Sequence, residues 1–413
     1  MDDPITLVAT IAALVIATLV LVALRTRSPR AAEFELTIVT PSGKRLPVRV
    51  TSASTIAQVK RLVHAAAPDA PVARQRLAKP GADALDDKST LSDAGIVAAG
   101  SHLVLAFGDA APGALLRHIG EGTGKGPLQF NQLNGICVDA ARRHLLIADR
   151  ENSRVQCVDA TTLRPVWTHA SSGGTLNYPN FLAMSLDNAL VFVTDGWSNR
   201  VATLDATNGK FIASCGSRGS GAAQFDAPQG LAVSPADGHV WVADHSNHRV
   251  SVFDASAQPW RSLGQIGSTG VDGDTNELLS SPHGLAIAGG RVYVSDQGNH
   301  RVQVFDAATR AHVLTVTGAP ASPLQSPTGI CVLGDALYVC DRDNARVCVF
   351  NATTGAWRGT LGSSDSRDDS GAPLFSPFVF HTGVYAICAD AAKREILVTD
   401  AGTNRVSVFA AYA

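Results

Sequence analysis

The sequence predicts a mainly β protein: a six-bladed β-propeller that follows one N-terminal transmembrane helix and a β-grasp domain. Three observations lead to this prediction. An Asp followed five positions later by an Arg recurs six times, and successive copies lie 45 to 59 positions apart. Short apolar segments flank each copy, and the chain before the first copy begins with a long apolar run. A fixed period of this length indicates an array of repeated supersecondary units.

Each repeat combines two apolar strands with a polar turn. Between Val240 and Asp254, Val alternates with other residues at the period of two that a strand requires. Asp and Asn in the turn can bond their own backbone. Because the same two residues recur in every unit, we interpret the Asp–Arg pairs as structural. The pairs are Asp149 and Arg154, Asp195 and Arg200, Asp244 and Arg249, Asp296 and Arg301, Asp341 and Arg346, and Asp400 and Arg405.

Two more strands complete each unit. An apolar segment such as 135–138 precedes the Asp, and another such as 211–214 follows the third strand. Four short antiparallel strands per unit are typical of a propeller blade. The units resemble NHL repeats, with His248 and His300 in the expected Asn-His-Arg context. The resemblance covers residues 113–413 and implies a six-bladed NHL propeller.

The ends of the repeat array predict how the ring closes. The last unit stops after its third strand, 406–409, close to the end of the chain. Residues 115–119 lie before the first unit and match a fourth strand. We therefore expect this N-terminal strand to complete the C-terminal blade, which removes the exposed edges of an open array.

The first residues predict a membrane anchor. Residues 5–24 form about twenty apolar residues, enough at ~1.5 Å per residue to cross a ~30 Å hydrocarbon core. The acidic start and the absence of a small-residue cleavage site in residues 25–30 argue against a signal peptide. Positive charge follows the span, so we expect a single-pass membrane protein with its N-terminus outside and the propeller in the cytosol. The sequence does not say which membrane.

Residues 34–107 predict a separate β-grasp domain. Two alternating segments form a hairpin, and residues 55–66 show helical spacing with Ser54 or Thr55 as the cap. A short strand near Leu77 and a closing strand at 103–107 follow. The segment resembles ubiquitin-like domains, notably at residues 55–60, 75–77 and 89–93.

Two departures from ubiquitin limit what that resemblance implies. No Gly-Gly end follows Phe107, so the domain cannot be processed and conjugated as ubiquitin is. Ala78 and Pro41 stand where the apolar partner-binding patch usually has larger aliphatic residues. The domain is thus either a folded spacer or a docking signal for ubiquitin receptors or the proteasome.

Cysteine usage and charge exclude some functions. The seven cysteines include no metal-type CxxC pair, and Cys137, Cys331 and Cys388 share one repeat position that is Ala in other blades. We interpret them as small core residues, with a thiolate metal ring as the alternative. Residues 113–413 carry 22 Lys and Arg against 26 Asp and Glu, so charge does not favour nucleic acid. A local basic patch could still bind RNA.

One propeller face collects the candidate binding residues. In a four-stranded blade, the turn between the second and third strands opens on the same face as the link to the next blade. Loops on a rigid scaffold often carry function, and Trp and Arg are typical binding anchors. The candidate residues on these turns are Arg150, Trp197, His245, His248, Gln297, His300 and Arg342.

A metal enzyme is the alternative for the same face. Some NHL propellers are amidating lyases that hold a metal through histidines at the starts of the innermost strands, and His283 matches that position. The corresponding residues in the other blades are Asn134, Asn180, Gln229, Thr328 and Tyr385. The sequence therefore favours no cofactor, no metal and no catalytic residue, with His283 as a weak metal candidate.

The predicted function is that of a membrane-anchored adaptor. NHL propellers in ubiquitin ligases often select substrates, and here a ubiquitin-like segment lies on the same chain. We expect the propeller to capture a protein client and the ubiquitin-like domain to link it to the ubiquitin–proteasome system. The alternatives are an RNA-binding propeller and a metal-dependent lyase or hydrolase. The sequence does not identify the client, the face in use or the oligomeric state.

Overall fold

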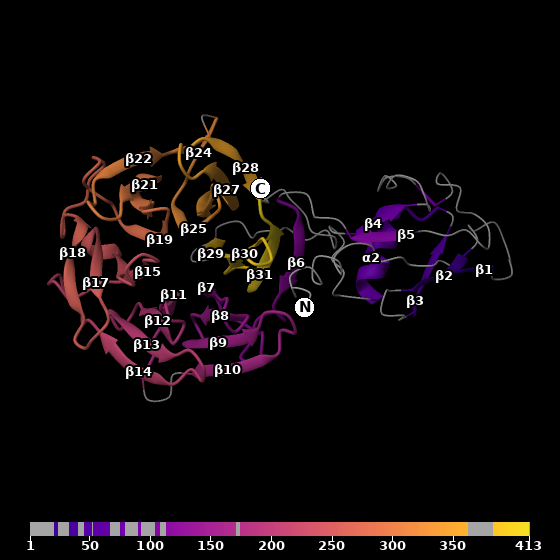
Figure 1. Ribbon diagram of the computed structural model, residues 1–413, viewed down its shortest axis with the longest axis horizontal. Helices are drawn as coiled ribbons and strands as arrows, with labels where there is room; N and C mark the ends of the chain where they lie inside the picture. The colour runs from indigo at the N-terminus through magenta and orange to yellow at the C-terminus, as the bar shows by residue number, and fades with distance from the viewer. Residues whose placement is uncertain are drawn as a thin grey trace, which may run out of the picture. The chain divides into compact units, whose positions relative to one another are not determined.

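The computed structural model describes residues 20–23, 33–39, 45–51, 53–66, 75–78, 90–91, 104–107, 113–170, 174–319, 321–361 and 383–412. The chain divides into two compact units, Met1–Leu116 and Arg117–Ala413. Six four-stranded antiparallel sheets form a ring, and the strand at residues 115–119, where the second unit begins, completes the last sheet (Figure 1).

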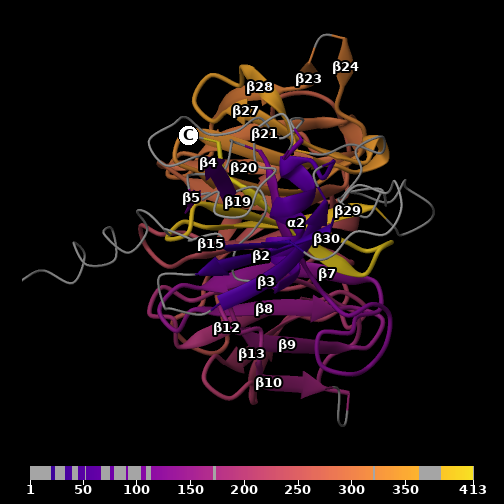
Figure 2. The same ribbon diagram turned by 90° about the vertical axis from the view of Figure 1, so that its right-hand side faces the viewer.

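Each of the first three blades is one sheet with its strands in sequence order, as blade 1 shows in Figure 2. Their strands are β7 (Leu133–Asp139), β8 (His144–Asp149), β9 (Arg154–Asp159) and β10 (Pro165–Ala170) in blade 1; β11 (Pro179–Met184), β12 (Leu190–Asp195), β13 (Arg200–Asp205) and β14 (Phe211–Cys215) in blade 2; and β15 (Pro228–Val233), β16 (Val240–Asp244), β17 (Arg249–Asp254) and β18 (Arg261–Gly267) in blade 3.

The remaining blades repeat this plan, and a small hairpin, β23 (Gly318–Ala319) and β24 (Ser322–Pro323), lies in the link between blades 4 and 5. Their strands are β19 (Pro282–Ala288), β20 (Arg291–Asp296), β21 (Arg301–Asp306) and β22 (His312–Val316) in blade 4; β25 (Pro327–Leu333), β26 (Ala336–Asp341), β27 (Arg346–Asn351) and β28 (Trp357–Leu361) in blade 5; and β29 (Val384–Asp390), β30 (Glu395–Asp400), β31 (Arg405–Ala410) and β6 (Leu115–Ile119) in blade 6.

The innermost strands of neighbouring blades contact one another around the centre of the ring (Figure 1). Glycine permits this close approach: a Cβ added to Gly284 would lie 2.1 Å from the carbonyl oxygen of Thr328 in the next blade. Apolar side chains fill the seams farther out. Phe192 of blade 2 meets Trp260 of blade 3 edge to face, with ring centroids 5.3 Å apart. The ring is therefore held by packing between blades as well as by hydrogen bonds within them.

The ring closes as the sequence predicts. Strand β6 is the outer strand of blade 6, next to β31, although most of the chain separates them. The guanidinium of Arg117 in β6 donates to both carboxylate oxygens of Glu395, at 2.8 and 2.7 Å, and Glu395 is only 3% exposed. His118 hydrogen-bonds to Ser407 through Nδ1 at 3.1 Å. The N-terminal strand thus satisfies what would otherwise be the bare edge of the last blade.

The N-terminal unit contains the hairpin, helix and closing strand that the pattern predicts. Its strands are β1 (Val20–Ala23), β2 (Glu33–Val39), β3 (Arg45–Thr51), β4 (Gln75–Ala78) and β5 (Val104–Phe107), and its helix is α2 (Ile56–Ala66). Sheet β1-β2-β3 and sheet β4-β5 are both antiparallel. Thr55 caps α2: its Oγ1 accepts from the Gln58 amide at 3.2 Å, and Gln58 Oε1 accepts from the Thr55 amide at 2.8 Å. Ile56, Val59 and Leu91 are fully buried.

The prediction of a single-pass membrane protein with a cytosolic propeller is wrong. Within the part of the chain that the structure describes, no helix is long and apolar enough to span a membrane. The last residues of the predicted span form strand β1, with Val20 opposite Thr37 of β2. Val20 and Val22 are β-branched, and a run of such residues fits a strand as well as a helix. Residues 5–19 lie outside the described residues.

Candidate functional site

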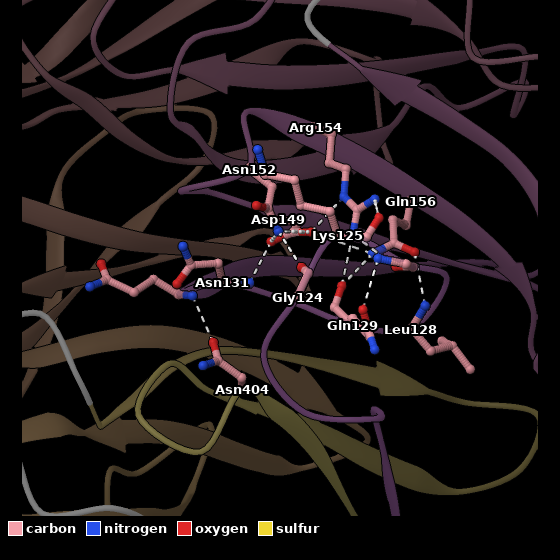
Figure 3. Close-up of polar contacts among 12 residues, drawn as sticks. Gly124, Lys125, Leu128, Gln129, Asn131, Asp149, Asn152, Arg154, Gln156 and Asn404 are labelled. Carbon is pink, nitrogen blue, oxygen red and sulfur yellow. Dashed lines mark hydrogen bonds and ion pairs between the residues drawn. The ribbon is translucent and has the colours of Figure 1, made fainter.

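In blades 1 to 5 an Asp–Arg pair ties the blade to the link before it, as Figure 3 shows for blade 1. Nε of Arg154 donates to Oδ2 of Asp149 at 2.6 Å, and its Nη2 donates to the carbonyls of Gly126 and Gln129 at 3.0 and 2.8 Å. Oδ1 of Asp149 accepts from the amide of Asn131 at 2.8 Å. The buried pair therefore satisfies backbone groups that the link would otherwise leave unpaired.

Four other blades contain the same ion pair. All six aspartates are fully buried, and Asp400 lies opposite Arg405 in the register of blade 6. In blades 1 to 5 the arginine also donates to backbone carbonyls of the preceding link, which makes these pairs part of the scaffold. The distances from Arg Nε to Asp Oδ2 are 2.9 Å for Asp195 and Arg200, 2.8 Å for Asp244 and Arg249, 2.7 Å for Asp296 and Arg301, and 2.7 Å for Asp341 and Arg346.

Two of the candidate histidines connect neighbouring blades. His248 and His300 both have the left-handed backbone conformation. The Nδ1 atom of His248 accepts from the amide of Ser281 at 3.1 Å, and that of His300 accepts from the amide of Ser326 at 2.9 Å. In blade 2, Asn199 makes the equivalent bond to the amide of Ala227 at 2.8 Å. We therefore assign His248 and His300 a structural role. The sequence holds a signal for this role, because blade 2 has Asn199 at the same repeat position.

We call the surface with the blade-to-blade links and these turns the link-side face, and its most exposed feature is an aromatic stack. The indole of Trp197 is 66% exposed and stacks on Tyr178, with ring centroids 5.0 Å apart and planes inclined by 26°. The guanidinium of Arg150 lies 5.0 Å from the centroid of the same Tyr ring. These three residues are the rim stack. Tyr178 lies in a link, and the repeat pattern does not single it out.

The centre of the link-side face is formed by the second residue of each innermost strand. We call this set the mouth ring; it contains Asn134, Asn180, Gln229, His283, Thr328 and Tyr385. Nδ2 of Asn134 donates to Oδ1 of Asn180 at 3.3 Å, and Nδ2 of Asn180 donates to the carbonyl of Pro228 at 3.1 Å. All members except Gln229 are buried, so these side chains fill the centre of the ring.

His283 is the most unusual member of the mouth ring. It is 2% exposed, and its ring lies 5.4 Å from Phe181, 6.3 Å from His245 and 5.2 Å from Tyr385, measured between ring centroids. Neither ring nitrogen has a hydrogen-bond partner among the described residues. Burial lowers the pKa of His283 well below its usual range, and the charges of Arg342 and Arg150 lower it further. His283 is therefore neutral at pH 7.

Three further candidate residues lie beside His283. Nε2 of His245 lies 3.3 Å from Oε1 of Gln297, and burial lowers the pKa of His245 as well. The positive charge of Arg342 is close enough to lower the pKa of both histidines. Nε of Arg342 donates to Asp343 at 3.0 Å, and its side chain is mostly buried. Arg342 is thus a mostly buried, ion-paired side chain rather than an exposed one.

The site does not fit a histidine-held metal. His283 is the only histidine of the mouth ring, and its neighbour His245 comes from a turn rather than from an innermost strand. Within the ranges that the structure describes, no group of three His, Cys, Asp or Glu residues could hold a metal ion. A catalytic zinc usually needs three protein ligands. We therefore derive no metal chemistry from this face.

The channel farther along the innermost strands is lined by small and aliphatic residues. Its cavity has a volume of about 310 Å³ and includes Cys137, Cys331 and Cys388 in its lining. Burial raises the pKa of all three thiols well above the usual value. The thiols are therefore protonated at neutral pH, which is consistent with small core residues.

The neutral state of His283 predicts a pH dependence of stability. The unfolded chain takes up a proton near the ordinary pKa of about 6.5, whereas the folded state resists protonation until lower pH, so stability falls as pH drops below that value. The slope contributed by one group is at most about 1.4 kcal/mol per pH unit. We expect His283→Phe to reduce the difference in urea midpoint between pH 7.5 and 5.5.

His239→Gln, a change at a half-exposed side chain, is the control. An unchanged pH difference in His283→Phe would contradict the assignment.

Comparison with known proteins identifies the repeats. The NHL repeat family model matches residues 130–158, 225–253, 279–305 and 324–350, in blades 1, 3, 4 and 5. A Caenorhabditis elegans protein, described as a probable peptidyl-alpha-hydroxyglycine alpha-amidating lyase, is 33% identical over 141 residues. That alignment covers 32% of this chain and only 39% of the relative.

Two solved structures are similar to part of this chain at low sequence identity. The Nidogen/Laminin complex has a TM-score of 0.47 and 16% identity, with 63% of this chain and 85% of that chain covered. Kuenenia stuttgartiensis hydrazine synthase has a TM-score of 0.44 and 18% identity, with 70% and 80% covered. The repeat matches and the sheet order agree on the C-terminal unit: this chain carries NHL repeats folded into a six-bladed β-propeller.

Proposed function

We propose that the protein is a protein-binding scaffold that captures a client on the link-side face of its propeller. The observation that supports this most strongly is the rim stack. Trp197 is 66% exposed and is held in place by stacking on Tyr178. Trp, Tyr and Arg are the residues that dominate binding energy at interfaces.

The rim stack is also organised before binding. Trp197 already stacks on Tyr178, and Glu151 accepts a hydrogen bond from Tyr178, which raises the pKa of the phenol. The guanidinium of Arg150 also lies over the ring of Tyr178. Because these side chains are already ordered, a partner would lose less conformational entropy on binding. Electrostatic attraction should contribute less to client binding than this stack does, since Arg150 and Arg342 are each already paired with an acidic neighbour.

We expect Trp197→Ala to reduce recovery of protein clients at least tenfold, because a hot-spot residue often contributes ~2 kcal/mol or more. The melting temperature should stay within about 1 °C of the wild type, since the side chain is mostly exposed. Recovery is measured by crosslinking and quantitative mass spectrometry with the full chain as bait. Leu186→Ala is the matched control, because Leu186 is 52% exposed in a turn between the first and second strands of blade 2. Equal recovery by Trp197→Ala would remove the rim stack from the binding site.

We further propose that the N-terminal unit is a ubiquitin-like domain that connects a captured client to ubiquitin receptors or the proteasome. The order of its elements supports this: a hairpin, a capped helix that contacts β3, and the β4-β5 pair. Leu91 packs with this unit and donates its amide to the carbonyl of Ser54 at 2.9 Å. That contact joins Leu91 to the residues just before the helix.

The full chain tests this connection directly. It should bind to an immobilised proteasomal ubiquitin receptor, and Ile56→Asp should abolish this binding, because Ile56 is fully buried in the N-terminal unit. The same variant should recover propeller clients as the wild type does. Failure of the unmodified chain to bind the receptor would leave the N-terminal unit as a spacer.

The two alternative functions have less support. A lyase is suggested by the short alignment to the nematode relative, but the mouth ring offers one histidine where a metal would need several. RNA binding needs a basic groove, whereas five of the repeat arginines are engaged in buried ion pairs. A client interaction that weakens steeply with salt would favour RNA.

A further inference from the structure

The link-side face carries more acidic than basic residues. Apart from the repeated Asp and Arg residues, its described links and turns contain four basic and seven acidic residues. The basic residues are Lys125, Arg150, Arg218 and Arg342, and the acidic residues are Glu121, Glu151, Asp226, Asp272, Asp274, Glu277 and Asp343. The field of this face therefore favours a positively charged partner.

The unmatched negative charge lies mainly in one link. Residues 268–281 join blades 3 and 4, and we call them the acidic link. Its carboxylates are those of Asp272, Asp274 and Glu277, and all three residues are exposed. None of the three has an ion pair or a side-chain hydrogen bond to any residue that the structure describes. Three of the four basic residues, by contrast, have an acidic neighbour within the same face.

A continuous band of contacts joins the acidic link to the rim stack. In blade 2, Nδ2 of Asn199 donates to the carbonyl of Trp197 at 3.2 Å, and its Oδ1 accepts from the amide of Ala227 in the next link at 2.8 Å. In blade 3, backbone hydrogen bonds of 3.1 and 3.0 Å join the turn at residues 245–248 to the links on both of its sides. The second of these links is the acidic link. The band thus runs from Trp197 across blade 3 to the three carboxylates.

An exposed apolar side chain lies at each end of this band. Among the described links and turns of this face, only Trp197 and Val271 are exposed large apolar residues, at 66% and 49%. Tyr178 stacks on one face of the indole, which leaves the other face for a partner. Trp is the best aromatic acceptor for a Lys or Arg cation. The apolar stems of Lys and Arg also suit contact with Val271.

We propose that this band binds a Lys- and Arg-rich segment of the protein client, with one cationic side chain on the indole of Trp197 and others beside the carboxylates of the acidic link. This inference rests on the proposed function and specifies the chemistry of the partner. A small cation cannot contact both ends, because the turn of blade 3 separates them, whereas an extended segment can. A nucleic acid would be repelled by the same carboxylates.

The test uses the full-length protein and two immobilised pools of randomised 15-residue peptides. One pool has Arg at every third position, and the other has citrulline, a neutral side chain of the same shape, at those positions. We expect the Arg pool to bind at least tenfold more tightly. The triple variant Asp272→Asn, Asp274→Asn, Glu277→Gln should lose at least fivefold in affinity for the Arg pool, and Trp197→Ala at least tenfold. All four side chains are exposed, so melting temperatures should stay unchanged.

The matched control removes the same charge from the opposite face. The variant Asp187→Asn, Asp237→Asn, Asp335→Asn changes three exposed carboxylates in turns between first and second strands. It should bind the Arg pool as the wild type does. Equal binding of the two pools, or an equal loss in this control, would overturn the inference. Tighter binding of a 20-nucleotide polyuridine RNA than of the Arg pool would show that the partner is a nucleic acid and would also overturn it.

Client recovery separates this inference from the proposed function. If the Arg pool does not bind while client recovery still depends on Trp197, only the present inference is wrong. Recovery that survives the triple change would likewise show that clients do not use the acidic link. If recovery does not depend on Trp197, the rim stack is not the client site, whatever the peptide pools show. Loss of both recovery and Arg-pool binding in the triple variant supports the basic segment as the partner.

Discussion

A protein truncated to residues 121–413 should aggregate or lose more than 10 °C in melting temperature relative to one that begins at residue 112. The shorter form lacks β6 and exposes the edge of β31. It also removes the buried side chains of Leu116 and Ile119 from blade 6. Burying an aliphatic side chain of this size stabilises a fold by about 1.5–3 kcal/mol. Thermal unfolding and light scattering of the two forms measure the effect.

Loss of the Arg117 ion pair adds to this effect. Without its guanidinium partner, Glu395 is left as a nearly buried carboxylate. Breaking a buried pair by removing one partner typically costs about 3–5 kcal/mol. Arg117→Ala in the full chain isolates this contribution, and a double variant Arg117→Ala, Glu395→Ala should recover part of it. Equal stability of the two truncated forms would mean that β6 does not hold the ring closed.

Arg249→Ala should destabilise the propeller by about 3–5 kcal/mol, because it leaves Asp244 as an unpaired buried charge. The change also removes donors from the carbonyls of Ser220, Gly221 and Gln224, which Arg249 binds at 2.8–2.9 Å. Urea denaturation measures the loss. The matched control in the same blade is Arg261→Ala, since Arg261 is 71% exposed and its pair with Asp254 lies at the surface.

The pH dependence of the stability of Arg249→Ala gives a second readout. Burial raises the pKa of Asp244 even with Arg249 present, and removal of the positive charge should raise it further. A carboxyl with a raised pKa in the folded state binds its proton more tightly than the unfolded chain does. The deficit of Arg249→Ala should therefore be smaller at pH 4 than at pH 7.5. A deficit that is independent of pH would contradict an unpaired Asp244 as its cause.

The N-terminal apolar run shows where sequence reasoning failed. Hydropathy measures how apolar a segment is, but an apolar run can pair as a strand as well as form a helix. At Val20–Ala23 the backbone pairs with β2, and that choice depends on residues 34–37, which lie more than ten positions away. A window of local hydropathy does not contain this information.

The candidate site was predictable only in part. The topology of a blade places Arg150, Trp197, His245, Gln297 and Arg342 on one face, and the structure brings His245, Gln297 and Arg342 near His283. Tyr178 was missed because its importance comes from stacking on Trp197, a contact that no repeat position marks. His248 and His300 were counted as binding residues, although each accepts a backbone amide of the next blade.

The sequence by itself determined the number of blades, the strand order and the closing strand. These follow from a period, from alternation and from residues such as the Asp–Arg pair, all of which repeat along the chain. Only the tertiary structure decided which polar groups are left without partners, because that depends on distances between blades. His283 has the same repeat position as Asn180, yet Asn180 is hydrogen-bonded and His283 is enclosed by rings from three other blades. Burial and pairing are properties of the assembled ring.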